Sequence, residues 1–135
     1  REIATVSGSQ GMFAPRWSPD GHYLSALTAD QHKLKLLELS TQQWSDLVDG
    51  HFLEYPNWSR DGKYIYFQDT TENGLELYRV SVASHKKEQV VSLKDIRRPS
   101  LFFGGFWSGL ALDGSPVIMR DAGTREIYAL EMQWP

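Results

Sequence analysis

A five-residue motif returns at a fixed distance along the chain. Trp-Ser-Pro-Asp-Gly at residues 17–21 reappears as Trp-Ser-Arg-Asp-Gly at 58–62, which is 41 residues later. The leucine-rich segment 34–39 falls on 75–80 at the same offset, and a weaker copy, Leu-Ala-Leu-Asp-Gly, stands at 110–114. Repetition with a period near 40 residues predicts an array of similar supersecondary units, each covered by its neighbours.

Each repeat has the pattern of short β-strands. The apolar runs 23–27 and 64–67 are bounded by turn residues, and the Asp-Gly and Asn73-Gly74 pairs favour tight hairpin turns. No stretch carries an apolar stripe at helical spacing over ten or more residues. Four strands per period of about 40 residues is typical of a β-propeller blade. The sequence therefore predicts an all-β fold of about three four-stranded antiparallel blades.

The 135 residues form a single propeller segment with blades at approximately 11–50, 51–94 and 95–135. The expected strands are 13–18, 22–28, 33–40 and 44–48, then 55–59, 63–68, 75–82 and 89–93, then 107–112, 116–120 and 126–133. The third blade lacks an outer strand. Residues 1–7 contain an unassigned strand, and we expect such a strand, from a partner chain or an adjacent region, to complete it.

Three blades do not close a ring, because propellers typically have four to eight. Two arrangements remain open: a partial propeller that belongs to a longer protein, or half of a six-bladed ring formed by two copies. The chain opens at Arg1 directly in strand-like sequence, which favours the first. Either way we expect self-association or the remainder of a longer propeller, since an open arc exposes apolar faces.

The composition excludes several classes of protein. Hydrophobic residues make up 41% and charged residues 23%, which is typical of a globular domain and not of a disordered chain. The net charge of −3 gives no electrostatic basis for binding nucleic acid, and no apolar run of 18 residues exists to contact a membrane. The chain has no Cys, so disulfides and thiolate chemistry are absent.

No catalytic or metal-binding constellation stands out. The sequence nearest to a serine-hydrolase elbow, Gly-Phe-Trp-Ser-Gly at 105–109, has the wrong spacing. The four His form no ligand cluster, so we predict no metal, no cofactor and no enzyme activity. Asp20, Asp61 and Asp113 occupy the same turn in different repeats, and we expect each to cap its own turn. Trp17 and Trp58 are expected to wedge between adjacent blades.

The loop 95–107 is the best candidate for a ligand-binding site. It is longer than its counterpart between the first two repeats, and residues with side chains typical of binding hot spots gather in it. They are Arg97, Arg98, Phe102, Phe103 and Trp107. The counterpart loop should emerge on the same face, and it contributes His51, Phe52 and Tyr55. An alternative is that Phe102, Phe103 and Phe106 plug the central channel or pad a blade junction.

The motif at 17–21, followed by an apolar strand and the leucine-rich strand 34–39, resembles the repeat of the TolB-like, or WD-like, β-propellers. The resemblance implies a non-catalytic interaction or sensor module that binds a protein or peptide on its loop face. It further implies the C-terminal part of a larger bacterial multidomain regulator, in a periplasmic or extracytoplasmic location. The alternative it implies is the substrate-gating propeller of a prolyl-oligopeptidase-type serine peptidase.

Overall fold

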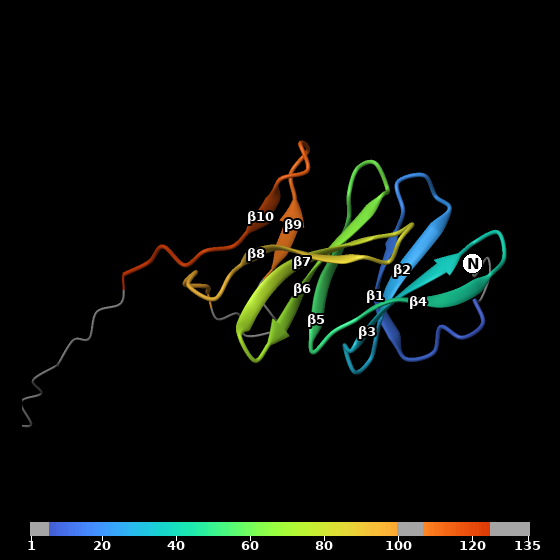
Figure 1. Ribbon diagram of the computed structural model, residues 1–135, viewed down its shortest axis with the longest axis horizontal. Helices are drawn as coiled ribbons and strands as arrows, with labels where there is room; N and C mark the ends of the chain where they lie inside the picture. Colours follow the sequence, from blue (N-terminus) through green and yellow to red (C-terminus); the bar gives the residue numbers. More distant parts are fainter. Residues whose placement is uncertain (1–5, 100–106, 125–135) are drawn as a thin grey trace, which may run out of the picture.

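Every element of the computed structural model, which describes residues 6–99 and 107–124, is a β-strand (Figure 1). The strands of the first sheet are β1 (Met12–Trp17), β2 (Tyr23–Thr28), β3 (Lys33–Glu38) and β4 (Gln43–Asp49). The second sheet contains β5 (Leu53–Trp58), β6 (Tyr64–Thr71), β7 (Gly74–Ser81) and β8 (Lys87–Ser92). The third consists of β9 (Ser108–Leu110) and β10 (Pro116–Ile118). All neighbours pair antiparallel in chain order, so the all-β fold of antiparallel blades is confirmed.

The observed strand boundaries differ from the predicted ones by a few residues. The largest differences are in the second sheet, where β5 begins at Leu53 and β6 continues to Thr71. The pairing of Leu53 with Asp69 explains the early start of β5, and the pairing of Thr70 with Leu75 and of Thr71 with Gly74 explains the late end of β6. The strands predicted at 2–6 and 126–133 fall outside the described residues, apart from residue 6, which is not in a strand. The completion of the third blade therefore stays a prediction.

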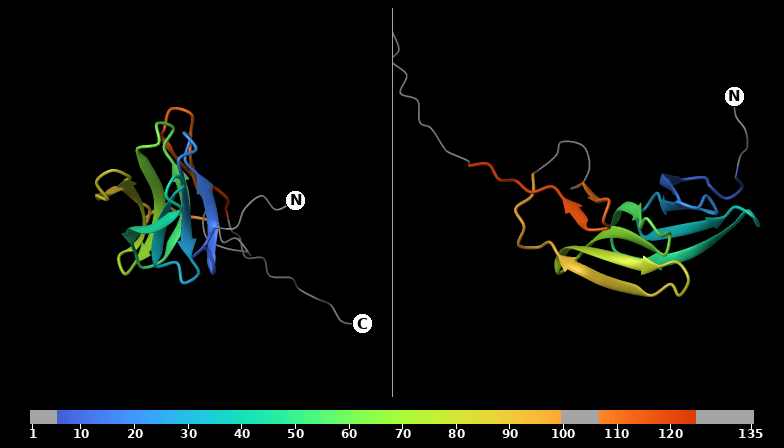
Figure 2. Two further views of the ribbon diagram at one scale, coloured as in Figure 1. Left: turned by 90° about the vertical axis from the view of Figure 1, so that its right-hand side faces the viewer. Right: turned by 90° about the horizontal axis from the view of Figure 1, so that it is seen from above.

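The first two sheets pack face to face through one apolar core. Its members come from both sheets: Leu27, Leu34, Leu36, Leu47, Leu53, Ile65, Phe67 and Val80. A backbone hydrogen bond reinforces the junction, since the N–H of Leu53 donates to the carbonyl of Gln31 at 2.8 Å. Figure 2 shows the β9–β10 hairpin on the side of the second sheet away from the first. The sheets thus succeed one another as blades.

The repeated Asp-Gly turn has the same hydrogen bonds in both complete blades. The Ser59 hydroxyl donates to Asp61 Oδ1 at 2.7 Å and accepts from the Tyr64 N–H at 2.9 Å, and Ser18 makes the equivalent bonds in the first blade. These bonds and backbone N–H donors lower the pKa of Asp20 and of Asp61. The predicted capping role of the turn aspartates is confirmed.

The third copy of the turn is one residue shorter. Its N–H···O bond runs from Ala111 to Ser115, whereas the matching bonds run from Ser18 to Tyr23 and from Ser59 to Tyr64. Ala111 has no hydroxyl, so Asp113 is held mainly by the N–H of Ser115 at 2.9 Å. Leu110 stands in the position of the repeat tryptophan and pairs with Pro116.

The two repeat tryptophans differ in their surroundings. Trp58 packs against the core, stacks on Tyr23 with ring centroids 6.5 Å apart, and donates its indole N–H to the carbonyl of Arg16 at 3.0 Å. Its predicted role as a wedge between blades is confirmed. The prediction for Trp17 is wrong within the described chain, because this side chain is 63% exposed. The physical reason is that no described blade lies beside that face of the first sheet.

Candidate functional site

The two loops predicted to form a binding site lie at the same end of the blades, opposite the Asp-Gly turns. Segment 50–52 leads into β5, and segment 93–99 follows β8. The two loops make corresponding backbone bonds: the Phe52 carbonyl accepts from Thr70 N–H at 3.1 Å, and the Arg97 carbonyl accepts from Asp121 N–H at 2.9 Å. The expectation that the loops share one face is therefore met by the described parts of both.

Arg98 and Tyr55 come together at the start of the innermost strand of the second blade. The Arg98 guanidinium donates to Gln68 Oε1 at 3.4 Å, and Gln68 is the cross-strand partner of Glu54. Burial lowers the pKa of Arg98, while the nearby Glu54 and Tyr55 act in the opposite direction. Burial and the charge of Glu54 raise the pKa of Tyr55. Through Gln68, Arg98 is linked to the strand pair that carries Glu54 and Tyr55, and all three residues are half-buried.

A buried carboxylate holds the loop that carries His51 and Phe52. Asp69 Oδ1 accepts the backbone N–H groups of His51 at 2.9 Å and Phe52 at 3.0 Å, and its Oδ2 pairs with Lys87 Nζ at 2.8 Å. The Lys87 ammonium also lies 4.2 Å from the ring centroid of Tyr78. His51 and Phe52 are thus fixed through their backbone, which leaves their side chains exposed to solvent.

The charge of Asp69 is stabilised in the folded protein. Burial by itself raises the pKa of Asp69, but the bond from Lys87 and the backbone N–H groups of Phe52 and His51 more than offset it. The net result is a pKa below the ordinary value of 3.8. Asp69 therefore stays ionised at neutral pH and serves as an anchor for the loop, since it bonds to the backbone of His51 and Phe52 and to Lys87.

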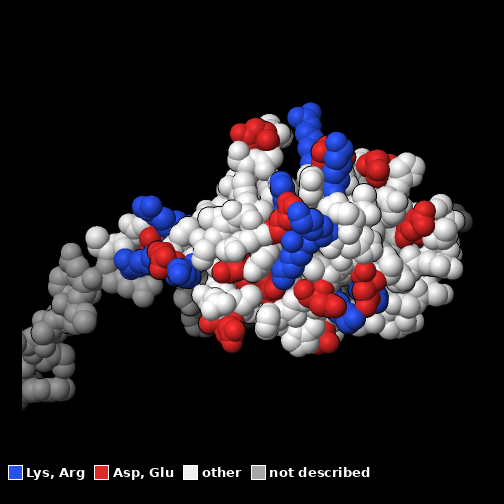
Figure 3. All heavy atoms as spheres, in the orientation of Figure 1, with Lys and Arg blue, Asp and Glu red and all other residues white. Residues whose placement is uncertain are grey.

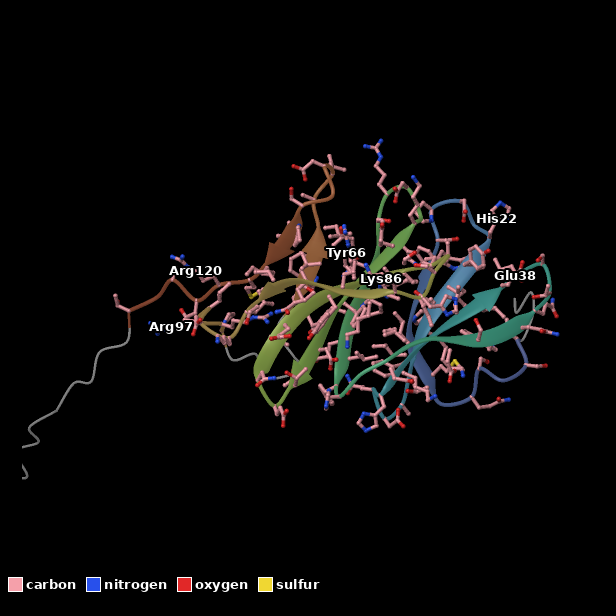
Figure 4. The ribbon with its side chains drawn as sticks, in the orientation of Figure 1. His22, Glu38, Tyr66, Lys86, Arg97 and Arg120 are labelled. Carbon is pink, nitrogen blue, oxygen red and sulfur yellow. The ribbon has the colours of Figure 1, made fainter. Side chains whose placement is uncertain are left out.

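Arg97 forms a separate part of the site beside the third sheet. Its Nε lies 3.0 Å from Asp121 Oδ2, and Asp121 also accepts the N–H of Gly123 at 2.9 Å. A pocket of about 450 Å³ opens here, lined by Asp95, Ile96, Arg97, Arg120, Asp121, Ala122 and Gly123. Figure 4 shows Arg97 and Arg120 on the two segments that meet at this place. Two arginines and two aspartates therefore line this pocket.

The remaining predicted site residues are only partly placed. Trp107 is exposed and lies immediately before β9, and its ring lies close over Gly109, where a Cβ would come within 2.8 Å of it. Phe102, Phe103 and Phe106 lie outside the described residues, so neither the binding role nor the alternative of a channel plug is tested for them.

Sequence reasoning missed Gln68 and Lys87 as parts of this end of the molecule, and its expectation that Asp69 is a solvated charge on a loop face is wrong, because Asp69 is fully buried. A usable signal existed for Asp69 and Asp121, since each stands eight residues after the aspartate of its Asp-Gly turn. Among the described residues no group of three or more His, Cys, Asp or Glu could hold a metal ion. The site combines guanidinium groups, a phenol, a carboxylate and an exposed Phe52, which is a chemistry of recognition.

Comparison with known proteins identifies the fold. TolB from Acinetobacter baumannii superposes with a TM-score of 0.66 at 19% identity, over 83% of this chain and 27% of that one. The propeller domain of the trilobed protease from Pyrococcus furiosus gives a TM-score of 0.52 at 12% identity, over 87% of this chain and 43% of that one. The tricorn protease gives 0.55 at 11% identity, over 63% of this chain and 9% of that one.

In sequence, the chain is similar to the WD repeat-containing protein AAC3 of Dictyostelium discoideum, with 33% identity over 79 residues. That match covers 57% of this chain and 16% of the relative. No protein-family model matches. The chain thus spans about a quarter of the TolB structure and a smaller share of the WD-repeat relative. Within the described residues no helix could cross a bilayer. The strand order, the repeated turns and these neighbours together show that the chain has the β-propeller fold of the TolB-like and WD-repeat proteins.

Proposed function

We propose that this chain is a non-catalytic interaction module that binds a protein or peptide at the loop end of its blades. The observation that carries the proposal is that half-buried Arg98, Glu54 and Tyr55 lie at the same end of the second blade as exposed Phe52, whose backbone N–H bonds to buried Asp69. Arginine and aromatic side chains supply most of the binding energy at protein interfaces. Loops on a rigid scaffold commonly carry such sites.

The cluster suggests what a ligand should look like. Arg97 and Arg120 line the pocket beside the third sheet together with Asp95 and Asp121, and Arg98, in the loop after β8, bonds to Gln68. Guanidinium groups bind carboxylates in a two-pronged geometry, so an acidic peptide with a neighbouring apolar side chain for Phe52 is the expected ligand class. The resemblance of the repeat to TolB-like propellers implies a part of a larger bacterial protein outside the cytoplasm. We extend this role to the chain.

Selection from a displayed peptide library tests the proposal. Selected peptides should be enriched in Asp or Glu and should bind the Phe52→Ala and Arg97→Ala variants about tenfold more weakly, as for residues at the centre of an interface. The matched control is Arg60→Ala, an exposed arginine on the Asp-Gly turn at the opposite end. A selection without enrichment, or peptides that bind all three variants equally, would count against a site at this end.

A second candidate is a gating propeller attached to a serine peptidase. Its support is the likeness in fold to the tricorn protease and to the propeller of the trilobed protease. A catalytic domain with a Gly-x-Ser-x-Gly elbow encoded next to this segment would decide in its favour. An adjoining regulatory domain without such an elbow would decide against it.

Ring completion by a second copy is a separate proposal. The free face of the first sheet exposes Trp17, and the strand β10 and the residue after it expose Val117 and Met119. These are the apolar surfaces that a neighbouring blade covers elsewhere in the chain. Sedimentation equilibrium should find a dimer that the Trp17→Glu variant dissociates, and a monomer at all concentrations would exclude the two-copy ring.

A further inference from the structure

An ion pair connects the outer strand of the second blade to the loop that carries Phe52. Lys87 is the first residue of β8, and its ammonium lies 2.8 Å from Asp69 Oδ2. The other oxygen of this carboxylate accepts the backbone N–H groups of His51 and Phe52. The Lys87 side chain is partly exposed, whereas that of Asp69 is fully buried. A positive charge on the outer strand is thus linked to the loop through a single carboxylate.

Two aromatic rings hold the Lys87 ammonium in place. Its Nζ lies 4.2 Å from the ring centroid of Tyr78 and 5.5 Å from that of Phe67. The two rings are stacked with their centroids 6.0 Å apart, and Phe67 is fully buried in the core. Cation–π attraction therefore adds to the ion pair and fixes the position from which the ammonium neutralises Asp69.

The loop passes close to the carboxylate that Lys87 neutralises. A Cβ on Gly50 would come within 2.9 Å of Asp69 Oδ2 and within 2.2 Å of Leu53 Cδ2, so the backbone of the loop lies directly against both side chains. The next two residues then donate their N–H groups to Asp69. The position of segment 50–52 therefore depends on the place and the charge of this one carboxylate.

The first blade forms without such an ion pair. In the strand pairing, Trp44 takes the place of Lys87. Thr28 takes the place of Asp69, and its hydroxyl donates to Asp30 within the same hairpin. Removing two charges from water carries a desolvation penalty, and the fold of the blade does not require it. The presence of the pair beside the loop of the second blade therefore points to a role beyond folding.

The ammonium of Lys87 keeps Asp69 charged in its buried position. Burial raises the pKa of Asp69, and the bond from Lys87 is the strongest of the effects that lower it. The nearest acidic group is Glu76, the cross-strand partner of Asp69, which accepts the Tyr78 hydroxyl. His51, the titratable residue of the loop, meets Asp69 through its backbone. Without the ammonium, a buried carboxylate beside an acidic neighbour binds a proton more readily, and a protonated carboxyl is a weaker acceptor for the loop.

We propose that Lys87 is a positioning residue of the loop-end site, and that it sets the affinity of this site through Asp69 and not by contact with the ligand. The loop-end site consists of the residues proposed above to bind a ligand: Phe52, Glu54, Tyr55 and Arg98. The inference rests on the proposed function, since it concerns the same ligand. An ordered loop spares the ligand the entropic cost of fixing it on binding. Loss of the charge of Lys87 should therefore weaken binding although every group of the site is still present.

Nuclear magnetic resonance of the full chain without ligand tests the link between Lys87 and the loop. In Lys87→Met, which keeps the apolar stem, the amides of His51 and Phe52 should exchange with solvent about tenfold faster than in the parent. Their chemical shifts report the ionisation of Asp69, and the midpoint of this titration should move to higher pH. Lys87→Arg should restore both values, and Lys87→Gln gives the same comparison if Lys87→Met does not fold. Unchanged amides, or equal acceleration in the turn at 59–62, would overturn the proposal.

A neighbouring lysine provides the matched control for binding. Basic atoms gather at the surface over the β7–β8 hairpin, so a lost charge there also acts on an acidic ligand through space (Figure 3). Lys86 lies on this hairpin, is 72% exposed and pairs with Glu88 at 2.9 Å (Figure 4). The tightest-binding peptide of the selection described above should bind Lys87→Met about tenfold more weakly than the parent. It should bind Lys86→Met within about twofold of the parent. Equal losses in the two variants would refute a role that acts through Asp69.

The two measurements separate this proposal from the proposed function. A selection that yields no peptide would contradict the proposed function, while the amides of His51 and Phe52 still decide whether Lys87 positions the loop. A peptide that binds at the loop end with the same affinity for the parent and for Lys87→Met would contradict only the role of Lys87.

Discussion

The first and second blades share a repeat, yet equivalent positions in them have different surroundings. Trp17 is 63% exposed, whereas Trp58 is stacked and hydrogen-bonded between two sheets. Thr28 is part of a local turn with Asp30, whereas Asp69, at the same place in the second blade, is a buried anchor for the adjoining loop. The repeat specifies the backbone, and the neighbouring sheet decides what each side chain does there.

Replacing each tryptophan by alanine should give the largest difference between the two blades. Trp58→Ala should lower the free energy of unfolding by about 4 kcal/mol, because it removes a large packed side chain and its hydrogen bond to the Arg16 carbonyl. Trp17→Ala should cost less than about 1 kcal/mol in the isolated chain, since most of the ring already contacts solvent. Urea denaturation measures both. Equal losses would show that a second copy covers Trp17.

The next largest difference in the free energy of unfolding should come from Asp69 in β6 and from Thr28, its counterpart in β2. Asp69→Asn removes the ion pair with Lys87 but keeps an acceptor for the loop N–H groups. We expect a loss of about 2–3 kcal/mol, below the range for fully buried pairs because Lys87 is partly exposed. Thr28→Val is the matched change in the first blade and should cost about 1 kcal/mol. A smaller loss for Asp69→Asn than for Thr28→Val would refute the anchor.

The pH dependence of the unfolding midpoint tests how much the charge of Asp69 contributes to stability. The pKa of Asp69 in the folded protein lies below its ordinary value of 3.8, so its ionised form adds stability above that pH. This contribution disappears as the pH falls below about 4 and through the folded-state pKa. The difference in unfolding midpoint between the parent chain and Asp69→Asn should therefore narrow between about pH 6.5 and about pH 3. A constant difference would mean that the charge is not what stabilises the loop.

The smallest expected effects concern the hydroxyl of the Asp-Gly turn. Ser59→Ala and Ser18→Ala should each cost about 1 kcal/mol, because each removes a hydroxyl that bridges the turn aspartate and the next strand. Ala111→Ser makes the reverse change in the third copy. Its gain should be smaller, since the shorter turn places Ser115 where the longer turns place a tyrosine. Thermal melts of the three variants provide the comparison.

The repeat made the fold predictable because every signal it carries is local. The Asp-Gly turn, the apolar strands and the period together predict a four-stranded antiparallel sheet. The turn serine hydroxyl of the second blade bonds to Asp61 and to the N–H of Tyr64, both within five residues of it. Boundaries were less accurate at β5 and β6, where a cross-strand pair, Leu53 with Asp69, extends both strands.

The candidate site was only partly predictable for a corresponding reason. Arg98 and Tyr55 could be named from residue type and loop position, but their neighbour Gln68 lies in a different strand. Asp69 and Lys87 are 18 residues apart, and nothing in the local sequence links them. The exposure of Trp17 agrees with the apolar faces expected of an open arc of three blades, although its residue type alone predicted a wedge between blades.

The innermost strand of each complete blade contains an irregularity with a geometric consequence. Ala14 and Tyr55 both adopt a φ of 51°, and in each strand two residues stand opposite one on the partner strand. In an unbroken strand, residues an odd number of positions apart point to opposite faces. The extra residue shifts this phase, so that Leu53 and Trp58 both reach the first blade. Without the extra residue, Leu53 and Trp58 would point to opposite faces of the second sheet, so the bulge lets one strand contribute both side chains to the same junction.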